Sequence, residues 1–361
     1  MRASIRVWSI GAPRASSVGA PAACAAAFLA CLLVPFAGPS AQEAPQTFDD
    51  VLGHRIEWSL PPARIISLSP NLTEILFAIG CDSRVVGVTR FCDYPREVEA
   101  LPDVGGIVDP SLEALLALDP DLVLATRGNP LELMESLIKL HIPVYALETT
   151  GDLAQILNVI REIGAVTGHL PEAEALARSL EEKRSAVVGE TSRIEIDLRP
   201  RVYYGELEGA LWTAGPGSFI HNLIEDAGGR NVAGRAPAPW CALSLEAIVG
   251  EDPQVYLGVY AGADDPGDSL QLAAAPGVAA VEVRQFLKGH PVWRGTSLGR
   301  DPRIFLVAED RLLRPGPRTF DVLGELARFL HPGVWGADSG AAIAPDGGCA
   351  PARASGSQHG G

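Results

Sequence analysis

SLEALLALDPDLVLA, at residues 111–125, recurs as SLEAIVGEDPQVYLG at residues 244–258. The two stretches align without gaps, and seven of their fifteen positions are identical. Each begins with a serine that can cap a short helix, passes through an Asp-Pro turn and ends in an apolar run of β type. A repeat at a distance of 133 positions predicts two similar α/β lobes in one chain.

Strand and helix patterns alternate around the first copy. Residues 64–68 form a β-rich run, and a helix is expected from Asn71 to Ile79, where Gly80 stops it. Asn71 and Glu74 have the spacing of a capping box at the start of this helix. The same patterns predict strands over 85–89, 122–125 and 143–147 and a helix over 112–118. This alternation is typical of parallel βαβ units.

Residues 152–190 differ, because they predict two consecutive helices without a strand between them. The second helix is long and charged, and it could join two lobes. The alternation then resumes with strands over 201–207 and 254–258 and helices over 218–229 and 319–330. Ligands of such folds bind beyond the carboxyl ends of the strands, so a cleft between the lobes is the expected site.

The two ends of the chain differ in composition from the lobes between them. A basic stretch that ends at Arg14, an apolar run over 22–37 and small residues at Ser40 and Ala41 predict a signal peptide and export to the periplasm. We do not expect a lipid anchor at Cys31, because this cysteine lies inside the apolar run. The expected segments are a signal peptide (1–41), an N-terminal extension (42–63), an N-terminal lobe (64–165), a connecting helix (166–198), a C-terminal lobe (199–332) and a disordered tail (333–361).

Composition limits the function classes. The chain is 47% hydrophobic and 20% charged, which is a globular composition, and its net charge is −15. Such an acidic protein is a poor partner for nucleic acid or anionic lipid. No GxSxG, HExxH, P-loop or GxGxxG motif is present, and no histidine has another three or four positions away. We therefore expect no enzyme and no metal site. A periplasmic metal enzyme, with distant side chains brought together, remains the alternative.

Aromatic side chains in predicted loops are the candidates for ligand contact. They are Phe91, Tyr94, Trp212 and Trp240. From opposing lobes they could clamp a large ligand with a flat or bulky apolar face, and the alternative is that they cap the lobe cores. Arg127 follows a predicted strand, where its guanidinium could donate hydrogen bonds to a ligand.

These residues together resemble the periplasmic solute-binding proteins of ABC importers with a helical backbone (class III), which carry cobalamin, iron-siderophores or haem. The resemblance runs from Arg64 to Pro332 and is closest to the vitamin B12-binding members. It is carried by the motifs RIISLSPNLTEILFAIG, VVGVTRFCDYP, DPSLEALLALDPDLVLATRGN, PWCALSLEAIV and RPGPR. It implies two Rossmann-like lobes with parallel sheets, joined by a long rigid helix, with the ligand cleft between them.

The resemblance also implies a function. The ligand would be cobalamin or a related corrinoid, which is transported and is not a cofactor, and the partners would be the permease and ATPase subunits of an ABC importer. We expect a monomer. An iron-siderophore or haem is the alternative ligand: Arg90, Arg127 and Arg314 suit an anionic siderophore, whereas haem needs an axial Tyr or His. A non-transport interaction module on the same fold is a further alternative.

The family's cobalamin contacts transfer to positions of this chain by local motif. With Arg127 added, the expected ligand-binding residues are Phe91, Arg127, Trp212, Trp240, Asp310, Arg311, Leu312, Leu313 and Arg314. The family's vitamin B12 binder has Tyr at the position of Phe91 and Trp at the position of Ile107. Trp293, in a segment longer than is usual in the family, is a candidate for the missing aromatic face.

Glu113 and Glu246 occupy equivalent positions of the repeat. In the family, one surface glutamate on each lobe docks into arginine pockets of the permease, and these two match. The alternative is that each acid only stabilises a helix N-terminus, which contributes roughly 0.3–1 kcal/mol. Cys81 and Cys92 are close enough in sequence for a disulfide, and two free thiols are the alternative.

Overall fold

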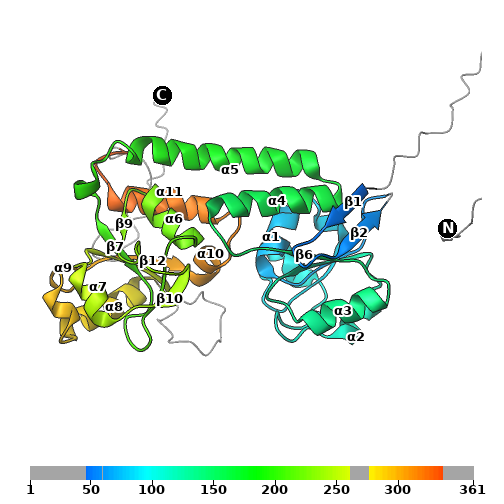
Figure 1. The fold of residues 1–361 in the computed structure, drawn as a ribbon, viewed down its shortest axis with the longest axis horizontal. Coiled ribbons are helices and arrows are strands. Elements are labelled where there is room, and N and C mark those ends of the chain that lie inside the picture. Colours follow the sequence, from blue (N-terminus) through cyan, green and yellow to red (C-terminus); the bar gives the residue numbers. More distant parts are fainter. Residues whose placement is uncertain (1–45, 59, 261–275, 336–361) are drawn as a thin grey trace, which may run out of the picture. The chain divides into compact units, whose positions relative to one another are not determined.

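The computed structural model describes residues 46–58, 60–260 and 276–335 (Figure 1). The expected signal peptide, Cys31 and nearly all of the expected tail lie outside the described residues. Among the helices that are described, none has the length and apolar character needed to cross a membrane.

The first lobe is built on a parallel sheet with the strand order β4-β3-β5-β6. Nearly every residue of these strands is buried, as is usual for a parallel sheet covered on both faces. Ile65, Leu122 and Leu124 face one buried cluster, and Ile66 and Val123 face another. Its strands are β3 (Ile65–Ser67), β4 (Val85–Val88), β5 (Leu122–Thr126) and β6 (Val144–Leu147), and its helices are α1 (Pro70–Ala78), α2 (Leu112–Ala117) and α3 (Leu131–Lys139).

The second lobe repeats this plan with a parallel sheet of order β12-β11-β7-β9. A separate antiparallel pair, β8 with β10, is added to it. Its strands are β7 (Arg201–Tyr204), β8 (Trp212–Ala214), β9 (Arg230–Asn231), β10 (Trp240–Ala242), β11 (Val255–Tyr260) and β12 (Arg303–Ala308). Its helices are α6 (Phe219–Asp226), α7 (Leu245–Gly250), α8 (Pro276–Gly289), α9 (Ser297–Arg300), α10 (Glu309–Leu313) and α11 (Thr319–Leu330).

The sequence repeat is also a repeat of local structure. Helices α2 and α7 have the same length, and each begins with a serine cap: Ser111 Oγ accepts a hydrogen bond from the amide of Ala114, and Ser244 Oγ accepts one from that of Ala247, both at 3.2 Å. The prediction of two similar α/β lobes is thus confirmed.

The turn after each of these helices is alike as well. Asp119 and Asp252 both have a left-handed backbone, with φ of 46° and 45°. An arginine at the start of each lobe's first strand stabilises this turn: Arg64 Nε donates to the carbonyl of Asp119 at 3.0 Å, and Arg201 Nε donates to that of Asp252 at 2.8 Å. The repeat therefore includes contacts that the aligned stretches alone do not contain.

Two consecutive helices without a strand between them, α4 (Leu153–Thr167) and α5 (Leu170–Thr191), follow the first sheet, as predicted. Between them Gly168 takes the left-handed conformation that ends a helix, with φ of 77°. Helix α5 packs along α4 and α11 (Figure 1). One buried cluster includes Ile65 and Val202 from the two sheets together with Ala177 of α5, so the lobes share a continuous core.

The N-terminal extension forms a hairpin that the sequence patterns did not predict, with strands β1 (Gln46–Asp49) and β2 (Arg55–Trp58). Asp50 caps its turn, since its carboxylate accepts hydrogen bonds from the amides of Leu52 at 2.9 Å and His54 at 2.8 Å. It also accepts one from the amide of Ala146 in the edge strand β6, at 3.0 Å. The hairpin is thereby attached to the first sheet.

The predicted capping box at Asn71 and Glu74 is wrong. Helix α1 begins one residue earlier, at Pro70, and Ser69 is its N-cap residue, without a side-chain cap bond. Proline suits the first helical position, because its missing N–H would have no partner there. Glu74 consequently lies in the second turn of the helix, where its side chain is buried.

Candidate functional site

The predicted ligand contacts follow the carboxyl ends of strands in both sheets. Phe91 comes three residues after β4, and Arg127 follows β5 directly. In the second lobe, α10 follows β12, and Thr213 of β8 donates to the carbonyl of Tyr204 at the end of β7, at 2.6 Å. In parallel sheets these ends share one edge, which is where ligands of such folds bind.

The β8–β10 pair brings two tryptophans together. In its register Trp240 lies opposite Ala214 and Trp212 opposite Ala242, so the indoles project from the same face at diagonal positions. Trp212 is 52% exposed and Trp240 is 41% exposed. Trp240 also meets the buried ring of Phe219 edge-on, with 6.1 Å between the centroids. The β8–β10 pair thus presents a broad aromatic surface, which Phe219 supports through its contact with Trp240.

Charged side chains join the edges of the two sheets. Arg314, just after α10, forms a two-pronged ion pair with the carboxylate of Asp93, which lies in the loop after β4. Asn71 Nδ2 donates to the carbonyl of Pro315 across the same junction, at 3.4 Å. Although burial opposes it, the Arg314 guanidinium holds the pKa of Asp93 below its usual range. The two edges therefore face each other.

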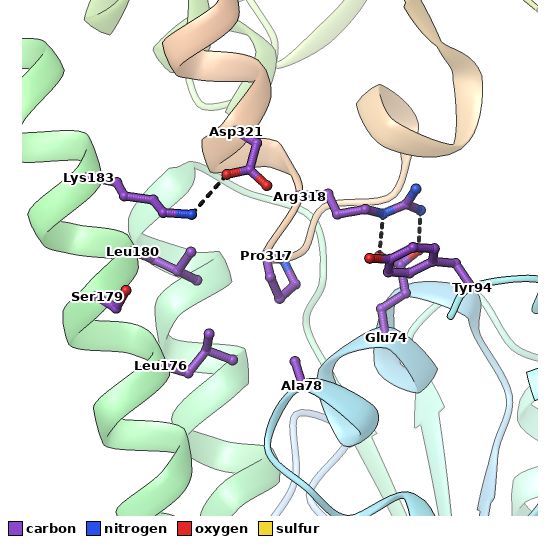
Figure 2. Close-up of a pocket in the computed structure, with 10 residues that line it drawn as sticks. All are labelled: Glu74, Ala78, Tyr94, Leu176, Ser179, Leu180, Lys183, Pro317, Arg318 and Asp321. Carbon is purple, nitrogen blue, oxygen red and sulfur yellow. Dashed lines mark hydrogen bonds and ion pairs between the residues drawn. The ribbon is translucent and has the colours of Figure 1, made fainter. Parts of the chain in front are cut away.

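A second ion pair lies deeper in this junction (Figure 2). Arg318 Nε donates to Glu74 Oε2 at 2.9 Å, and the Glu74 side chain is only 2% exposed. Arg318 also pairs with Asp310, and its guanidinium lies over the Tyr94 ring, 4.1 Å from the centroid. Burial raises the pKa of Glu74, against the attraction of Arg318 and Arg314.

A cavity of about 210 Å³ lies beside this ion pair. Figure 2 shows it between α5 on one side and the Glu74–Arg318 pair on the other. Across its opening Lys183 Nζ donates to Asp321 Oδ1 at 2.8 Å, and both side chains are about half exposed. Its lining residues are Glu74, Ala78, Tyr94, Leu176, Ser179, Leu180, Lys183, Pro317, Arg318 and Asp321.

The arginines that would suit an anionic ligand already have carboxylate partners. Arg90 pairs with Asp109, and Arg314 pairs with Asp93. Arg127 Nε donates to Glu148 Oε2 at 2.9 Å. The positive charge at these loops is therefore largely compensated within the protein.

Several predicted contacts are corrected by the structure. The side chain of Leu312 is fully buried in the core, so it cannot face a ligand, and Arg311 Nη2 donates to Glu325 of α11 at 2.7 Å. Trp293 is also fully buried: it packs against Tyr203 with 5.5 Å between the ring centroids, and its Nε1 donates to the carbonyl of Leu207 at 3.1 Å. It is a core residue and not a replacement aromatic face.

Cys81 and Cys92 do not form a disulfide in the structure; both are buried free thiols. Cys92 Sγ lies 3.2 Å from the hydroxyls of Thr73 and Thr89. Burial raises the pKa of both thiols, for Cys81 to about 11. Within the described ranges there is also no group of three or more His, Cys, Asp or Glu side chains that could hold a metal ion.

Glu113 and Glu246 are both exposed in the first turns of α2 and α7. The serine hydroxyls already cap these helices. Among the described residues, neither carboxylate has a hydrogen-bond or ion-pair partner, so both are free to meet another protein.

The sequence patterns select only part of the junction between the two edges. Arg314 and Asp310 are among the predicted ligand contacts, whereas the patterns give no interlobe role to Glu74, Asp93 or Arg318. A usable signal was present, because Glu74 is the one charge in the apolar helix PNLTEILFA. A charge among buried positions needs a partner, and Arg318 is one of the two arginines of RPGPR.

Two α/β lobes are built on parallel sheets whose carboxyl strand edges face each other, with exposed aromatics beside them. This is the architecture of a two-lobed ligand-binding protein. The family model described as periplasmic binding protein matches residues 65–310, and the chain belongs to this family. It is accordingly a substrate-binding protein of an ABC transporter and not an enzyme. Members of this family work with a permease and an ATPase.

Named relatives cover most of the chain. It is 30% identical over 273 residues to the vitamin B12-binding protein of Vibrio parahaemolyticus, and this alignment covers 75% of this chain and 90% of that protein. It is 29% identical over 294 residues to the cobalamin-binding protein of Halobacterium salinarum, covering 80% and 74%. Among solved structures, the periplasmic haem-binding protein RhuT of Roseiflexus matches with a TM-score of 0.62 and 27% identity, covering 74% and 98%.

Proposed function

We propose that this protein binds cobalamin or a related corrinoid between its lobes and delivers it to the permease of an ABC importer. The observation that carries the proposal is the pair of exposed tryptophans on the antiparallel strands β8 and β10. A corrin ring offers a broad, partly apolar face, and indoles bury large areas against such faces with little loss of rotamer freedom. Relatives named as vitamin B12-binding and cobalamin-binding proteins support the same ligand class.

Compensated charge argues against an anionic siderophore. A ligand with several carboxylates or catecholates needs free cationic side chains, because each buried anionic group must be paired. Arg90, Arg127 and Arg314 all have carboxylate partners. An anionic ligand would have to displace those partners, whereas a corrinoid need not.

Haem is the second candidate. Its iron needs an axial side chain, and Tyr94 supplies an exposed phenol ring in the loop after β4. The likeness to a haem-binding protein supports testing it. Arg318 lies over the face of this ring, however, and occupies part of the space around it. Haem therefore belongs in the same binding experiment as the corrinoid.

Calorimetric titration of the purified protein with cyanocobalamin tests the ligand. We expect one-to-one binding, and we expect Trp240→Ala to weaken it by about 10- to 100-fold, as for an aromatic hot spot. Ile196→Ala is the matched control, because Ile196 is exposed beyond the end of α5 and not at a strand edge. Binding of haemin without binding of cyanocobalamin would refute the corrinoid proposal.

We further propose that Glu113 and Glu246 dock this protein on the permease. Charge pairing at such a surface steers association and orients the complex. The free carboxylates at equivalent positions of the two lobes support this role. A non-transport module would have no need for the matched pair. We also propose that residues 1–41 are a signal peptide that is removed on export to the periplasm. The mature protein would then have its N-terminal lobe over residues 64–165 and its C-terminal lobe over residues 199–332.

Replacing both docking glutamates separates transport from binding. We expect Glu113→Ala with Glu246→Ala to keep full ligand affinity but to abolish stimulation of the permease-bound ATPase in reconstituted vesicles, because two charge pairs are lost. Glu132→Ala is the control, since Glu132 is also an exposed acid in a first helical turn, that of α3. Normal stimulation by the double variant would show that the acids serve only their helices.

A further inference from the structure

Five charged side chains form one network between the two lobes, which we call the interlobe clasp: Glu74, Asp93, Asp310, Arg314 and Arg318. Glu74 and Asp93 come from the first lobe, and the other three come from the second. Each arginine reaches a carboxylate of the opposite lobe. The clasp is therefore a direct charged connection between the lobes, separate from helices α4 and α5.

The inner part of the clasp has little freedom to move. The Arg318 guanidinium donates to Glu74 at 2.9 Å and 2.5 Å and to the carboxylate and carbonyl of Asp310 at 2.5 Å and 3.2 Å. The Tyr94 ring lies beneath it. Arg314 Nη1 adds a longer contact to Glu74, at 3.8 Å. Planar, bidentate contacts of this kind fix direction as well as distance.

The clasp lies beside the loops that carry the proposed ligand contacts. Asp93 is two residues from the exposed ring of Phe91, and Arg314 follows the half-exposed Leu313 directly. A shift of either ion pair would move these side chains relative to each other. The ligand-facing loops of the two lobes are thus held at a set separation by charges.

A cavity separates the inner ion pair of the clasp from helix α5. It occupies about 210 Å³ between α5 and the Glu74–Arg318 pair (Figure 2). The side chains of α5 therefore do not pack directly against this pair from that side. The lobes are joined by their shared core with α5 and, beside the cavity, by the clasp.

We propose that Glu74 and Arg318 are positioning residues for ligand binding. They set the spacing between the Phe91 loop and α10, and so the width of the binding site before a ligand arrives. Glu74 cannot touch the ligand itself, because its side chain is buried under Arg318. Holding the site at one width before a ligand arrives lowers the ordering cost of binding. The affinity part of this proposal rests on the proposed function.

The first test measures lobe separation without a ligand. Spin labels go on cysteines at exposed Val108 of the first lobe and exposed Glu208 of the second, in a background with Cys241→Ser and Cys349→Ser. We expect Glu74→Gln and Asp93→Asn to broaden the distance distribution. Lys183→Met should leave it unchanged, since its ion pair borders the same cavity but joins only α5 to α11. Unchanged distributions in both clasp variants would overturn the proposal.

A charge swap tests whether the Asp93–Arg314 pair itself holds the spacing. Asp93→Arg combined with Arg314→Asp should narrow the distance distribution relative to Asp93→Asn, because the two charges attract again with their ends exchanged. The recovery should be partial, since the new carboxylate lies near Glu74. Failure of the swap to improve on Asp93→Asn would show that the Asp93–Arg314 pair does not hold the spacing.

The second test measures affinity, with cyanocobalamin and haemin as probes. One of these probes should bind to the unmutated protein. We expect Glu74→Gln to raise the dissociation constant of that probe by about tenfold, because the site is no longer preorganised. If a variant has a broadened spin-label distance distribution but binds the probe with full affinity, the positioning role is refuted. If the unmutated protein binds neither probe, the ligand proposal fails, and the clasp is judged by the distance measurement alone.

Discussion

Arg318→Met is expected to lower the free energy of unfolding by about 3 kcal/mol at neutral pH, because it leaves the Glu74 carboxylate buried without its main partner. Loss of one member of a buried ion pair commonly costs about 3–5 kcal/mol. We expect the lower end, since Arg314 remains 3.8 Å from Glu74. Urea unfolding followed by circular dichroism measures the change.

The loss of stability in this variant should depend on pH. Burial already raises the pKa of Glu74, and removal of Arg318 takes away an opposing attraction, so the pKa rises further. The native variant then binds a proton that the unfolded chain releases above about pH 4.3, so its stability increases as the pH falls through the raised pKa. The loss should be smaller at about pH 5 than at about pH 7.5.

Lys183→Met is the control for this effect. It breaks an exposed ion pair at the same cavity and should cost no more than about 1 kcal/mol, with no recovery in acid. An equal loss from both variants, or a loss from Arg318→Met that stays constant with pH, would contradict the interpretation of Glu74 as a buried charge.

Trp293→Ala should lower the free energy of unfolding by about 3–5 kcal/mol, the usual cost of removing a large buried aromatic. The substitution opens a cavity against Tyr203 and leaves the carbonyl of Leu207 without its indole donor. The second lobe would lose the contact that joins η4 (Trp293–Gly295) to the loop after β7. Thermal and urea unfolding both report this change.

Trp212→Ala is the matched control for a tryptophan that is half exposed. We expect it to change stability by no more than about 0.5 kcal/mol. The two substitutions should then have opposite profiles: Trp293→Ala lowers stability and spares the ligand affinity of the folded protein, whereas Trp212→Ala lowers affinity and spares stability. If the Trp293→Ala protein is stable but binds its ligand more weakly, then Trp293 contacts the ligand and is not only a core residue.

The fold was predictable because its signals are local. The serine caps of α2 and α7, the Asp-Pro turns and the apolar strands all lie within short windows, and the last helix over 319–330 has the bounds that its pattern predicted. The N-terminal hairpin was not predictable in this way. Its attachment depends on Asp50 reaching the amide of Ala146, a contact between residues far apart in sequence.

The candidate site was predictable only in part, for the same physical reason. Residue type and expected loop position selected Phe91, Trp212 and Trp240, and the structure exposes all three. The loop position is wrong for two of them, because Trp212 and Trp240 begin the strands β8 and β10. Neither feature shows which aromatic is buried, so Trp293 was assigned to the ligand. The Glu74–Arg318 pair spans 244 positions and belongs to no local pattern. Pairings of this kind become visible only when the chain is folded.

The β8–β10 pair lies outside both parallel sheets, in a short ladder of its own. Its tryptophan side chains project from one face, whereas Thr213, on the other face, donates from its hydroxyl to the carbonyl of Tyr204. The aromatic surface can therefore vary without changing the strand pairing of either parallel sheet. Under the proposed function, evolution can change the recognised ligand at this surface while both lobes keep their fold.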